Sequence, residues 1–293
     1  MNDFVKALRA EMPDALSEMG GEVALTPRST SDLETALALA RTHDGRLRVP
    51  GGDAREGDLR IVLRFMGQLH SVDETSRIAH VGAGMGVAEF EACLRPEGLS
   101  LGCRACAGDE TLGRWIAMGA PGRRPSADDP VDQVLCGAEV MLADGRLLEL
   151  RPAPRRAVGP DLLGALLGGR GRLGVVLGLH LVLKARSRHT KRTYVFPSLA
   201  QAESACAWAR GRGLRATRLA TGPCAVGGGL WAEVACDEME APRLELLDEV
   251  CGERAGTLLA AADAPPWPEA ECASSSAILS ALARRLDPDR IFG

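Results

Sequence analysis

The sequence predicts an α+β fold built as two lobes, and both its length and a change of pattern near residue 190 support this prediction. The chain has 293 residues, of which 46% are hydrophobic. It can bury one large core or two modest ones, because domains usually hold roughly 100–200 residues. From residue 190 the pattern follows a β-α-β-β-α-β order, typical of a small domain. We therefore expect domains at 1–188 and 189–262, with a linker and C-terminal helix over 263–293 returning to the first domain.

The composition limits the classes of partner. The chain has 35 basic and 39 acidic residues and a net charge of −4, so charge offers no attraction for nucleic acid or an anionic membrane. The start lacks the pattern of a secretory signal, and no apolar run approaches the roughly 18 residues that a membrane span needs. Nine cysteines without a compact framework favour reduced thiols. We expect a cytoplasmic protein with no membrane span and no nucleic-acid partner.

The first glycine turn follows a helix and a short strand. Ser31 and Glu34 form a capping box that predicts a helix over 31–42. The next run, 46–49, predicts a strand that breaks at Pro50-Gly51-Gly52. Glycine permits backbone conformations and close approaches that a Cβ forbids, so this turn is a candidate ligand loop.

A second glycine cluster joins a strand to a helix. Strands are predicted over 60–64 and 77–82, and the second leads into Gly82-Ala83-Gly84-Met85-Gly86, after which the apolar spacing of 87–94 predicts a helix. This cluster lacks the spaced final glycine and the acidic ribose ligand of the dinucleotide-binding fingerprint, so a Rossmann fold is disfavoured. Thr111-Leu112-Gly113 opens another helical turn.

The middle of the chain contains a hairpin and a buried strand. The alternating run 134–143, the Asp144-Gly145 turn and the run 146–150 predict a β-hairpin. A helix over 159–167 then leads through glycines into the apolar run 175–183. Continuous apolar character predicts that this last strand is central in its sheet.

The second lobe supplies the remaining elements. We expect a strand at 190–196, a helix at 198–210 capped by Ser198 with Gln201, strands at 214–220 and 228–235, a helix at 240–251 and a strand at 256–260. A proline-rich linker at 263–268 leads to a last helix over 274–286.

Several of these motifs, taken in order, resemble one known family. The motifs are Pro50-Gly51-Gly52, Val81-Gly82-Ala83-Gly84, Thr111-Leu112-Gly113, Ala120-Pro121-Gly122-Arg123-Arg124-Pro125, the run from Val140 to Gly145, Gly171-Arg172-Leu173-Gly174-Val175-Val176 and the ending Asp287-Pro288-Asp289-Arg290-Ile291-Phe292. Together they resemble the PCMH-type FAD domain of the vanillyl-alcohol oxidase superfamily. The likeness is greatest to the FAD-binding subunit of bacterial glycolate oxidases, with some likeness to alkyl-dihydroxyacetonephosphate synthases.

The resemblance implies a PCMH-type two-lobe fold, with the β-α-β-β-α-β lobe as a small ferredoxin-like cap, and FAD as the cofactor. A diphosphate needs unhindered backbone N–H donors, which glycine-rich turns present. The positions that the resemblance assigns to FAD binding are Pro50, Gly51, Gly52, Asp53, Ala54, Thr111, Leu112, Gly113, Ala117, Gly122, Gly174 and Val175.

Some loop positions depart from the family pattern. Asp53 and Glu56 place two carboxylates near the expected diphosphate, and each costs on the order of a kcal/mol or more unless Arg55 compensates. Arg114 follows Gly113 where the family keeps a bare backbone, and arginine occupies 170 and 172. These changes weigh against tight FAD binding.

The resemblance implies a FAD-binding oxidoreductase, or a subunit of a larger oxidoreductase complex, whose flavin accepts a hydride from a small hydroxy acid or alcohol. The sequence identifies neither the substrate nor a catalytic residue. One alternative is a non-catalytic homologue that has lost FAD binding and serves as a scaffold or assembly partner. Another is a groove that holds a different anionic ligand through Arg114, Arg170 and Arg172.

Other residues with reactive side chains receive structural interpretations. Cys103-Arg104-Ala105-Cys106 is a lone C-x-x-C pair, and no metal site is predicted from it. The five histidines show no paired spacing, and His80 and His180 lie in apolar strands, where a hydrogen-bonded structural role is favoured over that of a base. Trp115 either covers a flavin ring or packs in the core.

Overall fold

The chain forms two compact units. Unit 1 comprises the described residues of 1–123, 133–185 and 272–293, and unit 2 those of 186–271. The computed structural model describes residues 3–102, 110–123, 134–153, 161–186, 188–216, 218–225, 227–236, 238–260, 263 and 277–292. The mixed α+β class predicted from the sequence is confirmed in both units.

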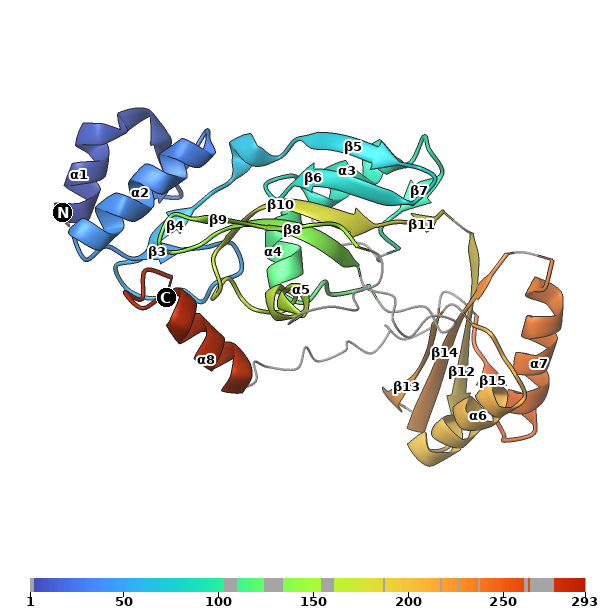
Figure 1. Cartoon of the computed structure of the whole chain (residues 1–293). Coiled ribbons are helices and arrows are strands. Elements are labelled where there is room, and N and C mark those ends of the chain that lie inside the picture. The colour runs from blue at the N-terminus through green and yellow to red at the C-terminus, as the bar shows by residue number, and fades with distance from the viewer. Residues whose placement is uncertain are drawn as a thin grey trace. The chain divides into compact units, whose positions relative to one another are not determined.

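The N-terminal part of unit 1 is a small sheet with two helices (Figure 1). Its elements are α1 (Asp3–Glu11), the 3-10 turn η1 (Pro13–Ala15), β1 (Leu16–Met19), β2 (Glu22–Leu25), α2 (Thr30–Thr42), β3 (Leu47–Arg48) and β4 (Leu59–Ile61). The strand order is β1-β2-β4-β3. β1 and β2 pair antiparallel, whereas β4 runs parallel to both β2 and β3.

Helix α2 begins with a capping box two residues earlier than predicted. The Ser29 Oγ accepts the N–H of Asp32 at 3.1 Å, and the Asp32 carboxylate accepts the N–H groups of Ser29 and Arg28. The predicted pair, Ser31 with Glu34, was wrong. Both pairs share the same spacing, but only Ser29 has the extended backbone that a cap requires, with φ −142° and ψ 165°.

The second sheet of unit 1 has five antiparallel strands in the order β5-β6-β10-β8-β9. The strands are β5 (Leu69–Asp73), β6 (Ile78–Gly82), β8 (Leu135–Met141), β9 (Leu147–Leu150) and β10 (Val175–Val182). The predicted hairpin is therefore confirmed as β8 and β9. The predicted central strand is confirmed as β10.

Short elements surround this sheet. They are η2 (Arg64–Met66), α3 (Val87–Leu94), the paired strands β7 (Leu99–Ser100) and β11 (Lys184–Ala185), α4 (Leu112–Ala117), α5 (Leu162–Leu166) and α8 (Ala277–Leu286). In Figure 1, α4 and α5 lie beneath β8 and β10. Trp115 of α4 is fully buried and its Nε1 donates to the Pro121 carbonyl at 3.0 Å, so this side chain packs in the core.

The C-terminal segment packs against β3. The Asp287 carboxylate accepts the N–H groups of Ile291 and Phe292, both at 2.8 Å, and the Ile291 carbonyl accepts the N–H of Leu47 at 2.8 Å. Burial raises the pKa of Asp287, although the two amide hydrogen bonds lower it. These contacts hold the end of the chain beside the strand that leads to the first glycine turn.

Unit 2 has its own core and the predicted order of elements. These are β12 (His189–Phe196), α6 (Leu199–Gly211), β13 (Arg218–Cys224), β14 (Gly227–Ala235), α7 (Glu240–Gly252) and β15 (Thr257–Leu258). The antiparallel sheet has the order β13-β14-β12-β15, and Ser198 caps α6 as predicted. Tyr194, the chain's single tyrosine, is buried here and donates to Asp248 at 2.6 Å.

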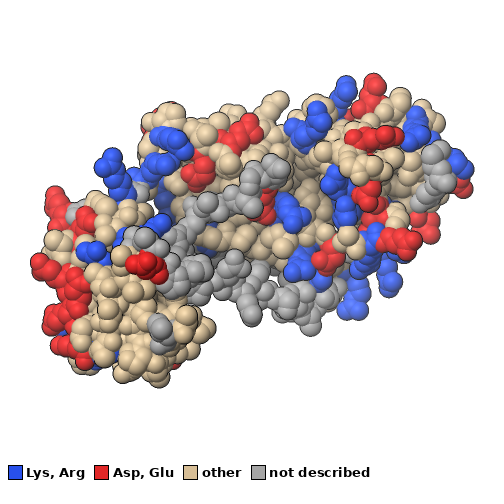
Figure 2. Space-filling view, turned by 180° about the vertical axis from the view of Figure 1, so that it is seen from behind, with Lys and Arg blue, Asp and Glu red and all other residues tan. Residues whose placement is uncertain are grey.

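Within the described ranges, no helix combines the length and apolar character needed to cross a membrane. Figure 2 shows basic and acidic side chains interspersed over the visible face of unit 1. The six described cysteines are free thiols, as the sequence predicts. Cys103 and Cys106 lie outside the described residues.

Candidate functional site

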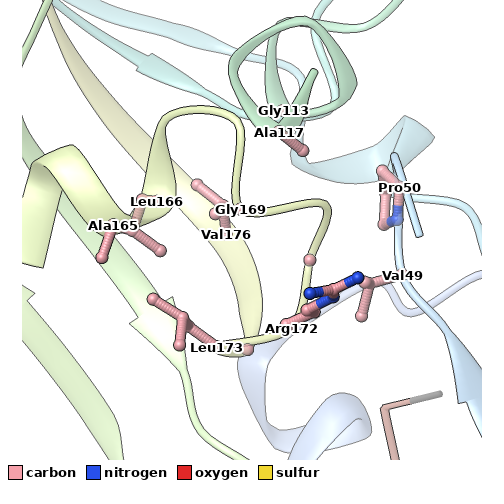
Figure 3. Close-up of a pocket in the computed structure, with 12 residues that line it drawn as sticks. Val49, Pro50, Gly113, Ala117, Ala165, Leu166, Gly169, Arg172, Leu173 and Val176 are labelled. Atoms are coloured by element: carbon pink, nitrogen blue, oxygen red, sulfur yellow. The ribbon is translucent and has the colours of Figure 1, made fainter. Parts of the chain in front are cut away.

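A small hollow opens in unit 1 where separate glycine-containing segments meet (Figure 3). Its lining residues are Val49, Pro50, Gly113, Ala117, Ala165, Leu166, Gly169, Gly171, Arg172, Leu173, Gly174 and Val176. The segments near 50, 113 and 174 therefore converge, as the sequence predicts.

The loop after β3 presents backbone N–H groups. The Gly52 N–H donates to the Val49 carbonyl at 3.0 Å and closes the turn. Within the described part of the chain, the N–H groups of Gly51, Asp53 and Ala54 donate no hydrogen bond. Neighbouring amides without protein partners are the donors that an anion needs.

Glycine at position 51 allows this loop to lie against α4. Gly51 has φ +87°, and a Cβ added there would lie 2.6 Å from the Cβ of Ala117. Both its backbone conformation and its close contact therefore disfavour a larger residue. The loop and the helix form adjacent walls of the hollow.

Helix α4 is held against the second glycine cluster. Thr111 caps the helix through the Arg114 N–H, at 3.3 Å. The Gly113 N–H donates to the Ala83 carbonyl at 2.8 Å, and a Cβ on Gly113 would lie 3.0 Å from the Cβ of Ala83. Glycine at this position brings the helix close to the turn that follows β6.

The loop that enters β10 forms the third wall. Its glycines at 168, 171 and 174 all have positive φ, and a Cβ on Gly171 would lie 1.8 Å from Cγ2 of Val49. The Arg170 N–H donates to the Ala117 carbonyl at 3.0 Å. This loop is therefore tied to α4 and packs closely on the residue before Pro50.

Opposite charges face one another beside the hollow. The Arg170 Nη1 lies 3.1 Å from the Asp53 Oδ1, with side-chain exposures of 44% and 60%. Arg170, rather than the expected Arg55, is thus the cation that compensates Asp53. The Arg114 side chain is 56% exposed and lies 3.8 Å from Glu110. Arg114 is not part of the lining, so it does not fill the hollow.

Comparison with known families identifies this arrangement. Residues 22–151 match the family described as the FAD binding domain. The match supports a PCMH-type FAD-binding domain over this part of the chain. The matched region contains the loop after β3, the turn after β6 and helix α4. The uncharacterized FAD-linked oxidoreductase YgcU from Escherichia coli (strain K12) is 26% identical over 132 residues, which cover 42% of this chain and 27% of that protein.

Curated relatives resemble parts of the chain. L-galactono-1,4-lactone dehydrogenase 1, mitochondrial, from Oryza sativa subsp. japonica is 29% identical over 187 residues, which cover 62% of this chain and 31% of that protein. Decaprenylphosphoryl-beta-D-ribose oxidase from Mycolicibacterium smegmatis is 27% identical over 162 residues, 51% of this chain and 34% of that protein. The chain thus spans about a third of the length of these relatives.

Among solved structures, an alkyldihydroxyacetonephosphate synthase superposes with a TM-score of 0.68 at 18% identity, over 88% of this chain and 61% of that chain. This similarity confirms the PCMH-type fold. The closer likeness to a glycolate oxidase subunit stays a prediction.

The PCMH-type site residues predicted from the sequence fall into distinct positions. Pro50, Gly113, Ala117 and Gly174 line the hollow. Gly51, Gly52, Asp53 and Ala54 form the adjoining loop, and Thr111 is the N-cap of α4. The side chains of Leu112 and Val175 are fully buried in the core, and Gly122 lies exposed in the turn after α4. Their roles in binding stay predictions.

Lining residues that sequence reasoning did not select share a property. They are apolar or glycine positions, and they are Val49, Ala165, Leu166, Gly169, Gly171, Leu173 and Val176. Arg172 also lines the hollow, and the sequence predicts it only as a contact of a different anionic ligand. Most resemble ordinary core residues in the sequence. The lining residues within 171–176 could have been found from the sequence, because they belong to the same glycine motif as Gly174.

Proposed function

We propose that this chain binds FAD in the hollow of unit 1 and acts as a flavin-dependent oxidoreductase or as the FAD-binding subunit of one. The observation that carries the proposal is the loop 50–54, whose Gly51, Asp53 and Ala54 amides have no hydrogen-bond acceptor in the described part of the chain. They lie beside a hollow whose close packing depends on glycine. FAD would supply the acceptor for a hydride from the C–H of a small hydroxy acid or alcohol.

The residues around the hollow fit parts of this cofactor. The loop amides are suited to bind the diphosphate, and the Arg172 guanidinium in the lining adds positive charge. Val49, Leu166 and Val176 supply apolar contacts that exclude water from a bound ring. The work of these residues is to bind and orient the cofactor.

The test is the visible absorption spectrum of the purified chain, followed by titration of the apoprotein with FAD. We expect a flavin spectrum or saturable uptake of one FAD per chain, with a rise in the melting temperature. A colourless protein whose melting temperature is unchanged at saturating FAD would exclude the proposal.

A non-catalytic scaffold or assembly partner is the second candidate. Arg172 is the only titratable residue among those lining the hollow in the described structure, so this lining offers no general base. The pair of Arg170 and Asp53 also joins two walls without a ligand. Turnover of hydroxy acids or alcohols with an artificial electron acceptor would rule out this candidate.

A further inference from the structure

We propose that His80, Glu139 and His180 form a binding site for a divalent transition-metal ion, with Zn²⁺ the best-suited ion. The three residues come from the adjacent strands β6, β8 and β10 of unit 1. One ligand atom from each lies within 4.8 Å of the others. The proposal does not depend on FAD binding, because none of these residues lines the hollow.

The sheet register places the three side chains on one face. His80 and His180 are directly paired across β6 and β10, and Glu139 pairs with Gly178 of β10. The residues that flank the two histidines within their strands are fully buried: Ala79, Val81, Leu179 and Leu181. Since strand side chains alternate between faces, the histidines lie on the face opposite this core.

The side chains are already close to one another. The His80 and His180 rings stack with centroids 4.3 Å apart and an angle of 15° between their planes. The Glu139 Oε1 lies 3.0 Å from the His80 Nε2, and the two side chains are 35% and 27% exposed. The two side chains are therefore partly sheltered from solvent.

Glycines beside the cluster leave room for these side chains. A Cβ on Gly178 would lie 2.6 Å from the Glu139 carboxylate, and a Cβ on Gly137 would lie 2.9 Å from Cδ2 of His180. Gly137 is the residue paired with His180 on β8. A side chain at position 178 would therefore collide with the Glu139 carboxylate, and one at position 137 would collide with the His180 imidazole.

The His80 Nε2 is a buried atom without a hydrogen-bond partner in the described structure. The Glu139 oxygen is close enough for an ion pair, but the contact does not have hydrogen-bond geometry. A cation placed between the nitrogen and the carboxylate would satisfy both atoms.

The donor set selects the class of ion. Two imidazoles and one carboxylate suit Zn²⁺, Fe²⁺, Co²⁺ or Ni²⁺, whereas Mg²⁺ and Ca²⁺ prefer oxygen ligands alone. Tetrahedral Zn²⁺ holds its nitrogen ligands about 2.0–2.1 Å away, so the imidazole rings must turn out of their stacked arrangement to direct both nitrogens at one ion. A further position is open to water or to His70, whose ring centroid lies 4.6 Å from that of His80.

The experiment uses the full chain after removal of metal with EDTA. Titration with Co²⁺ should give visible d–d absorption that saturates at one ion per chain, and Zn²⁺ should displace it. We expect His80→Ala, His180→Ala and Glu139→Gln each to weaken Co²⁺ binding by more than about tenfold. Loss of an outer-shell partner of a metal ligand already weakens binding by about ten- to a hundredfold, and loss of a ligand itself should cost at least as much. His43→Ala, which removes a histidine elsewhere in unit 1, should leave binding unchanged.

Several results would overturn the proposal: no saturable Co²⁺ absorption, a thiolate charge-transfer band that assigns the ion to cysteines, or equal affinity in His43→Ala, His80→Ala and His180→Ala. If a variant fails to fold, histidine-labelled NMR of the unsubstituted chain decides. Zn²⁺ must then shift the ring signals of a subset of the five histidines, and a shift of none or of all contradicts the site.

Discussion

Arg170 forms an ion pair with Asp53, with 3.1 Å between Nη1 and Oδ1. The pair joins the loop that enters β10 to the loop that follows β3. Both side chains are substantially exposed, so the pair contributes only about 0–1 kcal/mol to stability. Its larger consequence is electrostatic, because it offsets the negative charge that Asp53 places beside the proposed diphosphate position.

The first prediction concerns the charge at position 53. Asp53→Asn should tighten FAD binding by about two- to fivefold, because it removes a nearby negative charge and leaves Arg170 available to the diphosphate. Isothermal titration with FAD measures the change. Asp14→Asn, which removes an exposed carboxylate elsewhere in unit 1, is the control. Weaker binding in Asp53→Asn alone would contradict this account.

The second prediction concerns Gly51. Gly51→Ala should weaken FAD binding by about tenfold or more, because φ of +87° and a Cβ 2.6 Å from Ala117 force the loop to shift. The matched control is Gly211→Ala, where an added Cβ would have no neighbour within 4 Å. Flavin fluorescence titration measures the affinity. Unchanged FAD affinity in a folded Gly51→Ala protein would place the cofactor elsewhere.

The third prediction separates the two capping boxes that the sequence allows. Ser29→Ala should lower the free energy of unfolding by about 0.5–2 kcal/mol, because Ser29 Oγ accepts the Asp32 N–H. Ser31→Ala, at the cap expected from the sequence, should change it by less than about 0.5 kcal/mol. Urea unfolding of both variants measures the difference. A larger loss of unfolding free energy in Ser31→Ala than in Ser29→Ala would show that Ser31 is the N-cap.

Local signals predicted the element types better than their ends. The Asp144-Gly145 pair placed the β8–β9 hairpin, because these turn residues mark where the chain reverses between two alternating runs. Strand β13, in contrast, begins at Arg218 and not at 214. Leu214 and Ala216 are buried in the core of unit 2 without being part of the strand, so their apolar character reflects packing.

The approach of segments distant in the sequence could be inferred only where several motifs followed the order of a known family. The convergence of the segments near 50, 113 and 174 followed from the family pattern, since a dinucleotide needs several loops at once. The approach of His80, Glu139 and His180 depends on the register of three strands. Nothing in their spacing along the chain reports that register, so the cluster was visible only in the structure.

The fourth prediction concerns acid stability. The Arg28 N–H, followed by contacts with Ser29, lowers the pKa of Asp32 below the reference value of 3.8. A carboxyl whose folded pKa is depressed contributes stability that is present above the unfolded pKa and lost as pH falls through the folded pKa. Asp32→Asn should therefore show a shallower loss of melting temperature below about pH 4.

Melting curves between about pH 5 and pH 2.5 measure this slope. Glu34→Gln, which alters an acid in the first turns of the same helix outside the observed capping box, is the control. An acid slope in Asp32→Asn equal to that of the unsubstituted chain would show that the capping carboxylate is not responsible.

The last prediction concerns the C-terminal segment. Asp287 is 6% exposed and uses its two oxygens to accept the N–H groups of Ile291 and Phe292. Asn has one acceptor oxygen, so Asp287→Asn leaves one of these buried donors without a partner, at a cost of about 1–3 kcal/mol. Because the same segment pairs with Leu47 of β3, hydrogen exchange at the Leu47 amide should also accelerate.

The control is Asp289→Asn, on the exposed side of this turn, which should alter neither the free energy of unfolding nor the exchange rate at Leu47. If Asp287→Asn leaves both unchanged, the carboxylate does not anchor the end of the chain to the strand that precedes Pro50.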